Sequence, residues 1–266
     1  MERIEKKLVH VAENELPIVY VGSKDKLSIQ GTSKGCQSKW KIKDLFVKAN
    51  TKGYFEDIAE VLTSHLISFT NIQNYVQYYA CRIFEDDKFY GLGCYSRNFL
   101  NDNEQDISLY RLFLNMGLEL DEITCEDAIN IVKNELNLDI SNYLRDCFCI
   151  DAIVGNSDRH LSNLSIIKNK DTYRLSPVYD NGVSCLCSLY DYPLEDDINI
   201  LINSLHAKPF NTNYKEQILN NGFKPIKLKS KMFLESVYPE TEIEIRAFET
   251  IRILLKEMEG IAWIEF

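Results

Sequence analysis

Three oxygen-bearing side chains stand in an order and at a spacing that could do chemistry on a phosphate group. Asp158 and Asn163 lie five positions apart in the run Gly-Asn-Ser-Asp-Arg-His-Leu-Ser-Asn, and Asp180 opens an Asp-Asn-Gly run further on. A carboxylate can orient an acceptor hydroxyl and take its proton, while an Asn and a second Asp supply oxygen ligands for Mg²⁺ on phosphates. We therefore expect Asp158, Asn163 and Asp180 to be catalytic in phosphoryl transfer from ATP, with Asn163 and Asp180 as the Mg²⁺ ligands.

The elements around these residues predict that they meet. An apolar stripe of helical period runs through residues 144–154 and stops at Gly155, a common helix terminator. A polar loop follows, and two strands joined by a polar turn are predicted after it. This order brings the three side chains to one end of a hairpin. The alternative is that these Asp, Asn and Gly residues only make turns, but the ordered set of motifs favours a site.

The two motifs also carry a family resemblance. Residues 155–163 and 175–182 closely resemble the kinase core of HipA-like serine/threonine kinases, bacterial toxin kinases of toxin–antitoxin systems. The Asp-Arg-His-x-x-Asn order is also similar to phosphoinositide kinases, whose broad fold is the same. The resemblance is strong over residues 141–184 and weaker over 28–65 and 90–100.

The order of elements and the resemblance together imply an α+β, two-lobed protein-kinase-like fold. A small β-rich N-lobe, residues 1–98, would lie over a larger helical C-lobe, residues 99–266. Periodicity in the second part predicts helices at 108–116, 125–136, 141–154 and 242–258, with shorter ones at 195–203 and 214–219.

A small, polar segment at residues 28–40 could close over phosphates with its backbone N–H groups. It lacks the Gly-Lys-Ser/Thr of a Walker A loop. HipA-like kinases have a loop of similar make-up here, containing a serine that becomes phosphorylated. The resemblance implies Ser33 or Ser38 as that serine, and we place Ser33, Gly35 and Ser38 among the nucleotide-binding residues.

Lys48 ends an apolar strand and resembles the kinase lysine that contacts the α- and β-phosphates. Behind it, residues 55–66 have a clear helical stripe. Glu56 and Glu60 are one turn apart on this helix, and either could pair with Lys48. The resemblance favours Glu60.

Residues 75–84 and 89–96 alternate as a hairpin that would complete the N-lobe sheet. Backbone groups near Cys94 and Ser96 would then face the adenine.

Composition narrows the function classes. The chain of 266 residues is 45% apolar and 26% charged, as in globular proteins. No apolar run is long enough to span a membrane, and the polar start does not resemble a signal peptide, so we expect a cytoplasmic protein without membrane contact. The net charge of −10 and the lack of a basic block argue against direct nucleic-acid binding. The eight cysteines are interpreted as buried thiols rather than disulfides or metal ligands.

The leading interpretation is an ATP- and Mg²⁺-dependent Ser/Thr protein kinase. Asp158 would act as base and Lys48 would neutralise phosphate charge. Asn156 would hydrogen-bond Asp158 and fix its rotamer, and Arg159 and His160 would brace the loop. Asn156 and His160 are also expected to bind the nucleotide. The alternatives are a lipid or small-molecule kinase, which would need an acceptor pocket or a basic membrane-facing surface, and a nucleotide-binding pseudokinase, which would usually lack one of these residues.

The resemblance also implies biology. It suggests a bacterial toxin kinase regulated by autophosphorylation in the phosphate loop. HipA proteins carry an additional N-terminal domain ahead of that loop, so this chain resembles a stand-alone kinase core. An antitoxin or a separately encoded regulatory partner would then restrain it, and the sequence leaves the protein substrate open.

Overall fold

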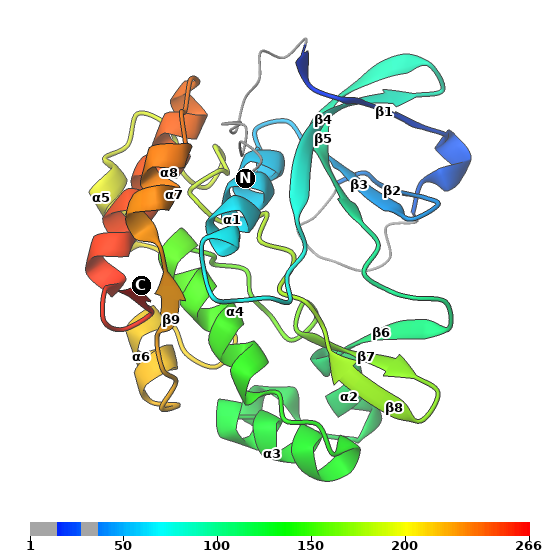
Figure 1. Cartoon of the computed structure of the whole chain (residues 1–266), viewed down its shortest axis with the longest axis vertical. Helices are drawn as coiled ribbons and strands as arrows, with labels where there is room; N and C mark the ends of the chain where they lie inside the picture. Colours follow the sequence, from blue (N-terminus) through cyan, green and yellow to red (C-terminus); the bar gives the residue numbers. More distant parts are fainter. Residues whose placement is uncertain (1–14, 28–36) are drawn as a thin grey trace.

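In the computed structural model, which describes residues 15–27 and 37–266, a curled five-stranded sheet lies beside a larger helical part (Figure 1). The strand order in the sheet is β1-β4-β5-β3-β2, with β1 parallel to β4 and the other pairs antiparallel. The strands are β1 (Ile18–Val21), β2 (Lys39–Ile42), β3 (Leu45–Ala49), β4 (Tyr78–Glu85) and β5 (Lys88–Arg97).

The two faces of this sheet have different roles. Cross-strand partners point to the same face, and successive residues alternate between faces. Trp40 and Val47 on one face form a small core with Cys81 and Ile83. Lys48 lies on the opposite face, toward the helical part.

The helical part is organised around the buried helix α4 (Ser141–Val154). The remaining helices of this part are α2 (Leu109–Asn115), α3 (Cys125–Leu136), α5 (Ile198–Asn203), α6 (Tyr214–Leu219), α7 (Ser230–Ser236) and α8 (Glu242–Met258). Helix α4 ends at Gly155, whose φ of +66° lies in the left-handed region that glycine adopts most readily. Helices α3 and α8 each begin with a capping box, at Thr124 and Thr241.

Two smaller sheets complete the helical part. Strands β6 (Glu104–Ser108), β7 (Ser165–Asn169) and β8 (Thr172–Leu175) form an antiparallel sheet, and β9 (Ile226–Leu228) pairs in parallel with β10 (Trp263–Glu265). The loop that carries Asp158 and Asn163 runs from α4 to β7, and Asp180 follows β8. The predicted order of helix, loop, hairpin and Asp is therefore observed.

Helix α1 (Glu56–Ser68) lies between the five-stranded sheet and the helical part (Figure 1). Its apolar stripe, including Ile58, Leu62 and Leu66, belongs to the large core of the helical part. Near its C-terminal end His65 Nε2 lies 2.8 Å from Ser236 Oγ of α7. Both contacts hold helix α1 on the helical part.

In the part of the chain that the structure describes, no helix has the length and apolar character needed to cross a bilayer. The seven cysteines described there are all buried free thiols, as the sequence predicts. The same residues contain no cluster of three or more His, Cys, Asp or Glu side chains arranged to hold a metal.

Candidate active site

Lys48 is the centre of a charged cluster between the sheet and the helical part. Its ammonium group donates to Glu60 Oε1 of α1 at 2.5 Å and to Asp180 Oδ1 at 2.7 Å. The other oxygen of Glu60 accepts a 2.9 Å bond from the backbone N–H of Asn181. One lysine and one carboxylate therefore join β3, α1 and the Asp-Asn-Gly segment.

Burial and charge act in opposite directions in this cluster. Burial alone would lower the pKa of Lys48, but attraction to Asp180 and Glu60 outweighs it and raises that pKa well above its usual value. The positive charge of Lys48 holds the pKa of Asp180 well below its ordinary range. Burial raises the pKa of Glu60, against the attraction of Lys48. At neutral pH Lys48 is charged and Asp180 is ionised.

Glu56, the alternative partner of Lys48, lies one turn away against the Asp-Asn-Gly segment. A Cβ at Gly182 would meet Glu56 Oε2 at 2.8 Å, so the Glu56 side chain packs directly on this glycine. Burial raises the pKa of Glu56 to about 7. The structure therefore gives Glu60 and Glu56 different surroundings, with Glu60 bonded to the lysine.

Arg159 links the loop of Asp158 to both neighbours of Asp180. Its guanidinium group donates to the Tyr179 carbonyl at 2.8 Å and to Asn181 Oδ1 at 2.7 Å. It also forms two bonds to Asp151 of α4, at 2.9 and 2.8 Å. The bracing role expected of Arg159 is observed, and its partner Asp151 is a site-supporting residue that the sequence analysis missed.

Asn156 shapes the backbone at Asp158. Its Oδ1 accepts from the Asp158 N–H at 3.1 Å, and its Nδ2 donates to Asp151 Oδ1 at 2.8 Å. The Tyr214 hydroxyl donates to the Asn156 carbonyl at 2.8 Å. Asn156 thus accepts from the backbone N–H of Asp158, whereas it was expected to fix the rotamer of the Asp158 side chain.

Asn163 closes the same loop. Its Nδ2 donates to the Asp158 carbonyl at 3.1 Å, and its Oδ1 accepts from the His160 N–H at 2.9 Å. The Asp158 carboxylate remains 40% exposed, with His160 Nε2 3.8 Å from Oδ2. A side chain held at its backbone and open at its carboxylate can meet an acceptor from solution.

The oxygen-bearing side chains of Asn163 and Asp180 suit Mg²⁺. Asp180 is ionised, and its side chain is 34% exposed. The amide oxygen of Asn163 accepts one hydrogen bond, and such an oxygen has two lone pairs. Mg²⁺ takes one or two protein oxygens and completes its shell with phosphate and water, so the residue types of Asn163 and Asp180 fit the ion.

The predicted adenine-facing residues lie deeper than expected. Cys94 and Ser96 are buried in β5, which has β4 on one side and β3 on the other. The backbone groups of a strand flanked on both sides are used in its two ladders. The chain leaves the sheet only after Arg97, so a backbone edge free to meet a base would begin there.

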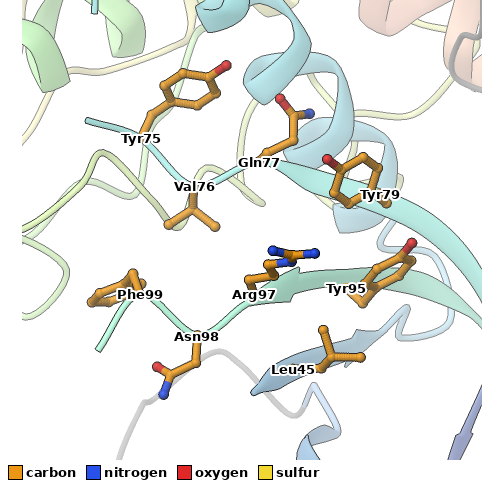
Figure 2. A pocket seen from close by; sticks show the side chains of 9 residues that line it. All are labelled: Leu45, Tyr75, Val76, Gln77, Tyr79, Tyr95, Arg97, Asn98 and Phe99. Carbon is orange, nitrogen blue, oxygen red and sulfur yellow. The ribbon is translucent and has the colours of Figure 1, made fainter. Parts of the chain in front are cut away.

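A cavity of about 440 Å³ opens beside this strand end (Figure 2), and Lys48 is not among its lining residues. Tyr95 and Arg97 line it, and they alternate along β5 with Cys94 and Ser96, which share the face of Lys48. The side chains drawn in Figure 2 are Leu45, Tyr75, Val76, Gln77, Tyr79, Tyr95, Arg97, Asn98 and Phe99. The cavity therefore does not contain the charged cluster.

The predicted phosphate loop is only partly described. Ser33 and Gly35 lie outside the described residues. Ser38 is described, and its hydroxyl lies 2.7 Å from the Tyr90 hydroxyl. On the two sides of the gap, Leu27 N–H donates to the Lys39 carbonyl at 2.8 Å, and Lys39 is the cross-strand partner of Lys48. Leu27 and Ser38, on either side of the undescribed residues, therefore lie beside Lys39 of β2, the strand that pairs with the strand of Lys48.

Comparisons with known proteins bear on the fold. No family model matches the sequence, and no curated protein matches it. The structure is similar to that of CtkA, a proinflammatory kinase of Helicobacter pylori, with a TM-score of 0.59 and 12% identity over 85% of this chain and 91% of that one. It also matches a chain from the HipA, HipB and operator DNA complex, a toxin–antitoxin system of Shewanella oneidensis MR-1. There the TM-score is 0.45 with 13% identity, over 89% of this chain and 60% of that one.

At this identity the likeness to CtkA concerns the fold. The charged cluster, the loop that carries Asp158 and the Asp-Asn-Gly segment occur within an architecture shared with a kinase over most of both chains. The α+β, two-lobed kinase-like fold that the sequence motifs implied is confirmed.

Proposed function

We propose that this protein is an ATP- and Mg²⁺-dependent kinase that phosphorylates Ser or Thr hydroxyls of a protein. The observation that carries the proposal is the bridge from Glu60 through Lys48 to Asp180, at 2.5 and 2.7 Å. In protein kinases a strand lysine must be paired with a helix glutamate, and the metal-binding Asp must be in place, before transfer can occur. The bond of Lys48 to Glu60 supports the first condition, and the place of Asp180 beside Lys48 supports the second.

Each remaining residue has a role in the transfer. Asp158 orients the acceptor hydroxyl and takes its proton, a contribution of roughly 10²–10⁴ in rate. Lys48 neutralises charge on the phosphates of ATP, and Asn163 and Asp180 would hold Mg²⁺. The bound ion supplies further neutralisation of phosphate charge. Arg159 keeps the loop of Asp158 in register with Asp180 through its bonds on either side of that residue.

The proposal includes regulation through the phosphate loop. Phosphate on Ser33 or Ser38 would add roughly −1.5 to −2 charge beside a site for polyanionic ATP, and repulsion would weaken nucleotide binding. Ser38 precedes Lys39, the cross-strand partner of Lys48, and its hydroxyl contacts that of Tyr90 on the sheet face opposite Lys48. Mass spectrometry of protein made with wild-type and Asp158→Asn chains tests this. Phosphate in residues 28–40 of the wild type alone supports self-inhibition, and its absence from both rejects that part.

The biological part of the proposal is a toxin kinase restrained by an antitoxin or another regulatory partner. It depends on the motif resemblance to HipA-like kinases. Expression in bacteria should arrest growth, and Asp158→Asn should relieve the arrest. Equal arrest by both chains would separate any toxicity from kinase chemistry.

The experiment for the proposed activity is incubation with γ-labelled ATP, Mg²⁺ and a cell lysate. A kinase acting on protein will label a lysate protein or itself, and the Asp158→Asn chain will not. Label that appears only in lipid or in small molecules would favour the alternative acceptors. Nucleotide binding without any transfer would identify a pseudokinase.

A further inference from the structure

A second lysine faces the carboxylate of Asp158. Lys208 Nζ lies 3.6 Å from Asp158 Oδ1, and the Lys208 side chain is 50% exposed. His160 Nε2 lies near the other carboxylate oxygen, at 3.8 Å. Lys208 comes from the segment between α5 and α6, about 50 positions after Asp158 in the chain, and sequence spacing gave no reason to join the two.

One buried side chain of α6 fixes the backbone of the segment that carries Lys208, residues 204–213. Gln217 of α6 is 1% exposed. Its Nε2 donates to the Lys208 carbonyl at 3.0 Å, and its Oε1 accepts from the N–H groups of Phe210 and Asn211 at 3.1 and 3.2 Å. A buried amide that satisfies three backbone groups of one short segment sets the position of the Lys208 backbone.

The same segment is packed on the loop of Asp158. Tyr214 donates its hydroxyl to the Asn156 carbonyl, and the ring of Phe210 packs edge-on against Phe148 of α4 at 6.0 Å. A Cβ at Gly155 would lie 2.6 Å from Leu205 Cδ1, so the Leu205 side chain packs closely on the backbone at Gly155. Lys208 is therefore presented to Asp158 by a docked segment, while its long side chain stays free to move.

We propose that Lys208 is a catalytic residue that contacts the phosphoryl group during its transfer. This inference rests on the proposed function. The acceptor oxygen must lie within hydrogen-bond reach of the Asp158 carboxylate, and Lys208 is beside that carboxylate. Lys48 cannot serve there in the same way, because its ammonium group is bonded to Glu60 and Asp180. Two lysines thus divide the task, one at the bound phosphates and one at the acceptor side.

The transfer is a displacement at the γ-phosphorus of ATP. The acceptor oxygen forms a bond to the γ-phosphorus while the bond from that phosphorus to the bridging oxygen breaks. The bridging oxygen leaves with the electron pair as part of the nucleoside diphosphate, and the acceptor proton passes to Asp158. Negative charge is spread over the three outer oxygens of the moving group, and the Lys208 ammonium would stabilise it.

The test uses the full chain with three variants, Lys208→Met, Lys208→Arg and Lys215→Met. Lys215 is an exposed lysine on the adjacent helix α6 and serves as the matched control. The probes are fluorescent ADP with Mg²⁺, alone and with aluminium fluoride, which stands in for the moving phosphoryl group. This readout needs no protein substrate. We expect fluoride to tighten ADP binding in the wild type and Lys215→Met chains.

Removal of one transition-state donor typically costs 10²–10³ in rate. Lys208→Met should therefore lose most of the tightening by fluoride, on the order of tenfold or more. Its affinity for ADP with Mg²⁺ alone should stay within about threefold of the wild-type affinity. Lys208→Arg should retain part of the tightening. Equal tightening in Lys208→Met and wild type, or none in either, overturns the role of Lys208. Failure of the wild type to bind ADP with Mg²⁺ at all would instead reject the proposed function, and this inference with it.

Discussion

Arg159 and Asp151 form a two-bond ion pair in the interior of the protein, with side chains that are 0% and 1% exposed. The pair joins helix α4 to the loop that carries Asp158. The same carboxylate accepts from Asn156, and the same guanidinium reaches Asn181. The geometry of the candidate site therefore depends on a buried hydrogen-bond network centred on Arg159 and Asp151, whereas the Asp158 carboxylate that it positions is exposed.

Removal of one partner from this pair should be strongly destabilising. Asp151→Ala would leave the Arg159 charge buried without its main partner, and we expect the free energy of unfolding to fall by about 3–5 kcal/mol. Urea unfolding followed by circular dichroism measures the change. The control is Glu249→Ala, which breaks the exposed pair with Arg252 and should cost less than about 1 kcal/mol. A loss below 1 kcal/mol for Asp151→Ala would show that the network does not stabilise the fold.

Glu60 and Glu56 provide a matched comparison on one helix. Glu60→Gln removes the charged partner of Lys48, a hydrogen bond to a charged group worth about 1.5–3 kcal/mol, so kcat/KM for ATP should fall roughly 10- to 100-fold. Glu56→Gln leaves the lysine bridge intact and should change kcat/KM by less than about threefold. The measurement is steady-state transfer of labelled phosphate. Similar losses in the two variants would contradict the assignment of Glu60 as the functional partner.

Much of the fold could be predicted from local pattern. The predicted helices at 125–136, 141–154, 214–219 and 242–258 have the observed bounds. Their ends are defined by neighbours in sequence, such as the Thr124 and Thr241 caps and the glycine at 155. The helix predicted at 195–203 begins later, at Ile198, because Asp197 caps it.

The missed elements are short or depend on distant partners. β9 and β10 have three residues each and pair with one another across more than 30 positions. β6 is too polar to show strand alternation and is defined by its pairing with β7. Helix α7 has seven residues and no side-chain cap. Tertiary contacts determine these elements, and a single sequence does not display such contacts.

Anchoring of α1 through His65 should make stability depend on pH. Burial lowers the pKa of His65 below its ordinary value of 6.5, so the unfolded chain binds the proton more tightly than the folded one. The stability that follows from a neutral His65 is present above pH 6.5 and is lost as the pH falls through the folded pKa.

His65→Gln keeps a polar group opposite Ser236 but does not titrate in this range. Thermal unfolding at pH 7.5 and at pH 5.5 should therefore show a larger loss for wild type than for His65→Gln. A pH dependence that is the same in both chains would exclude His65 as its source.

The site shows the same division between local and distant information. Asp158, Asn163 and Asp180 were found because their motifs are contiguous in sequence. Asp151 was overlooked because it lies within the apolar pattern of α4, although a charged residue in such a stripe is itself a signal of a buried partner. Lys208 had no local signal, since only the packing of its segment on the loop brings it to Asp158.

Phosphoryl transfer by a chain altered at Asp180 tests the central claim most directly. Asp180→Asn keeps the shape of the side chain but removes the charge that faces Lys48 and would hold Mg²⁺. The measurement is transfer of label from γ-labelled ATP with Mg²⁺, made on wild type and on Asp180→Asn protein whose circular dichroism matches that of wild type. We predict transfer by wild type and a loss to background in the variant. Transfer at the wild-type rate by the folded Asp180→Asn protein would contradict the assignment of this cluster as a kinase site.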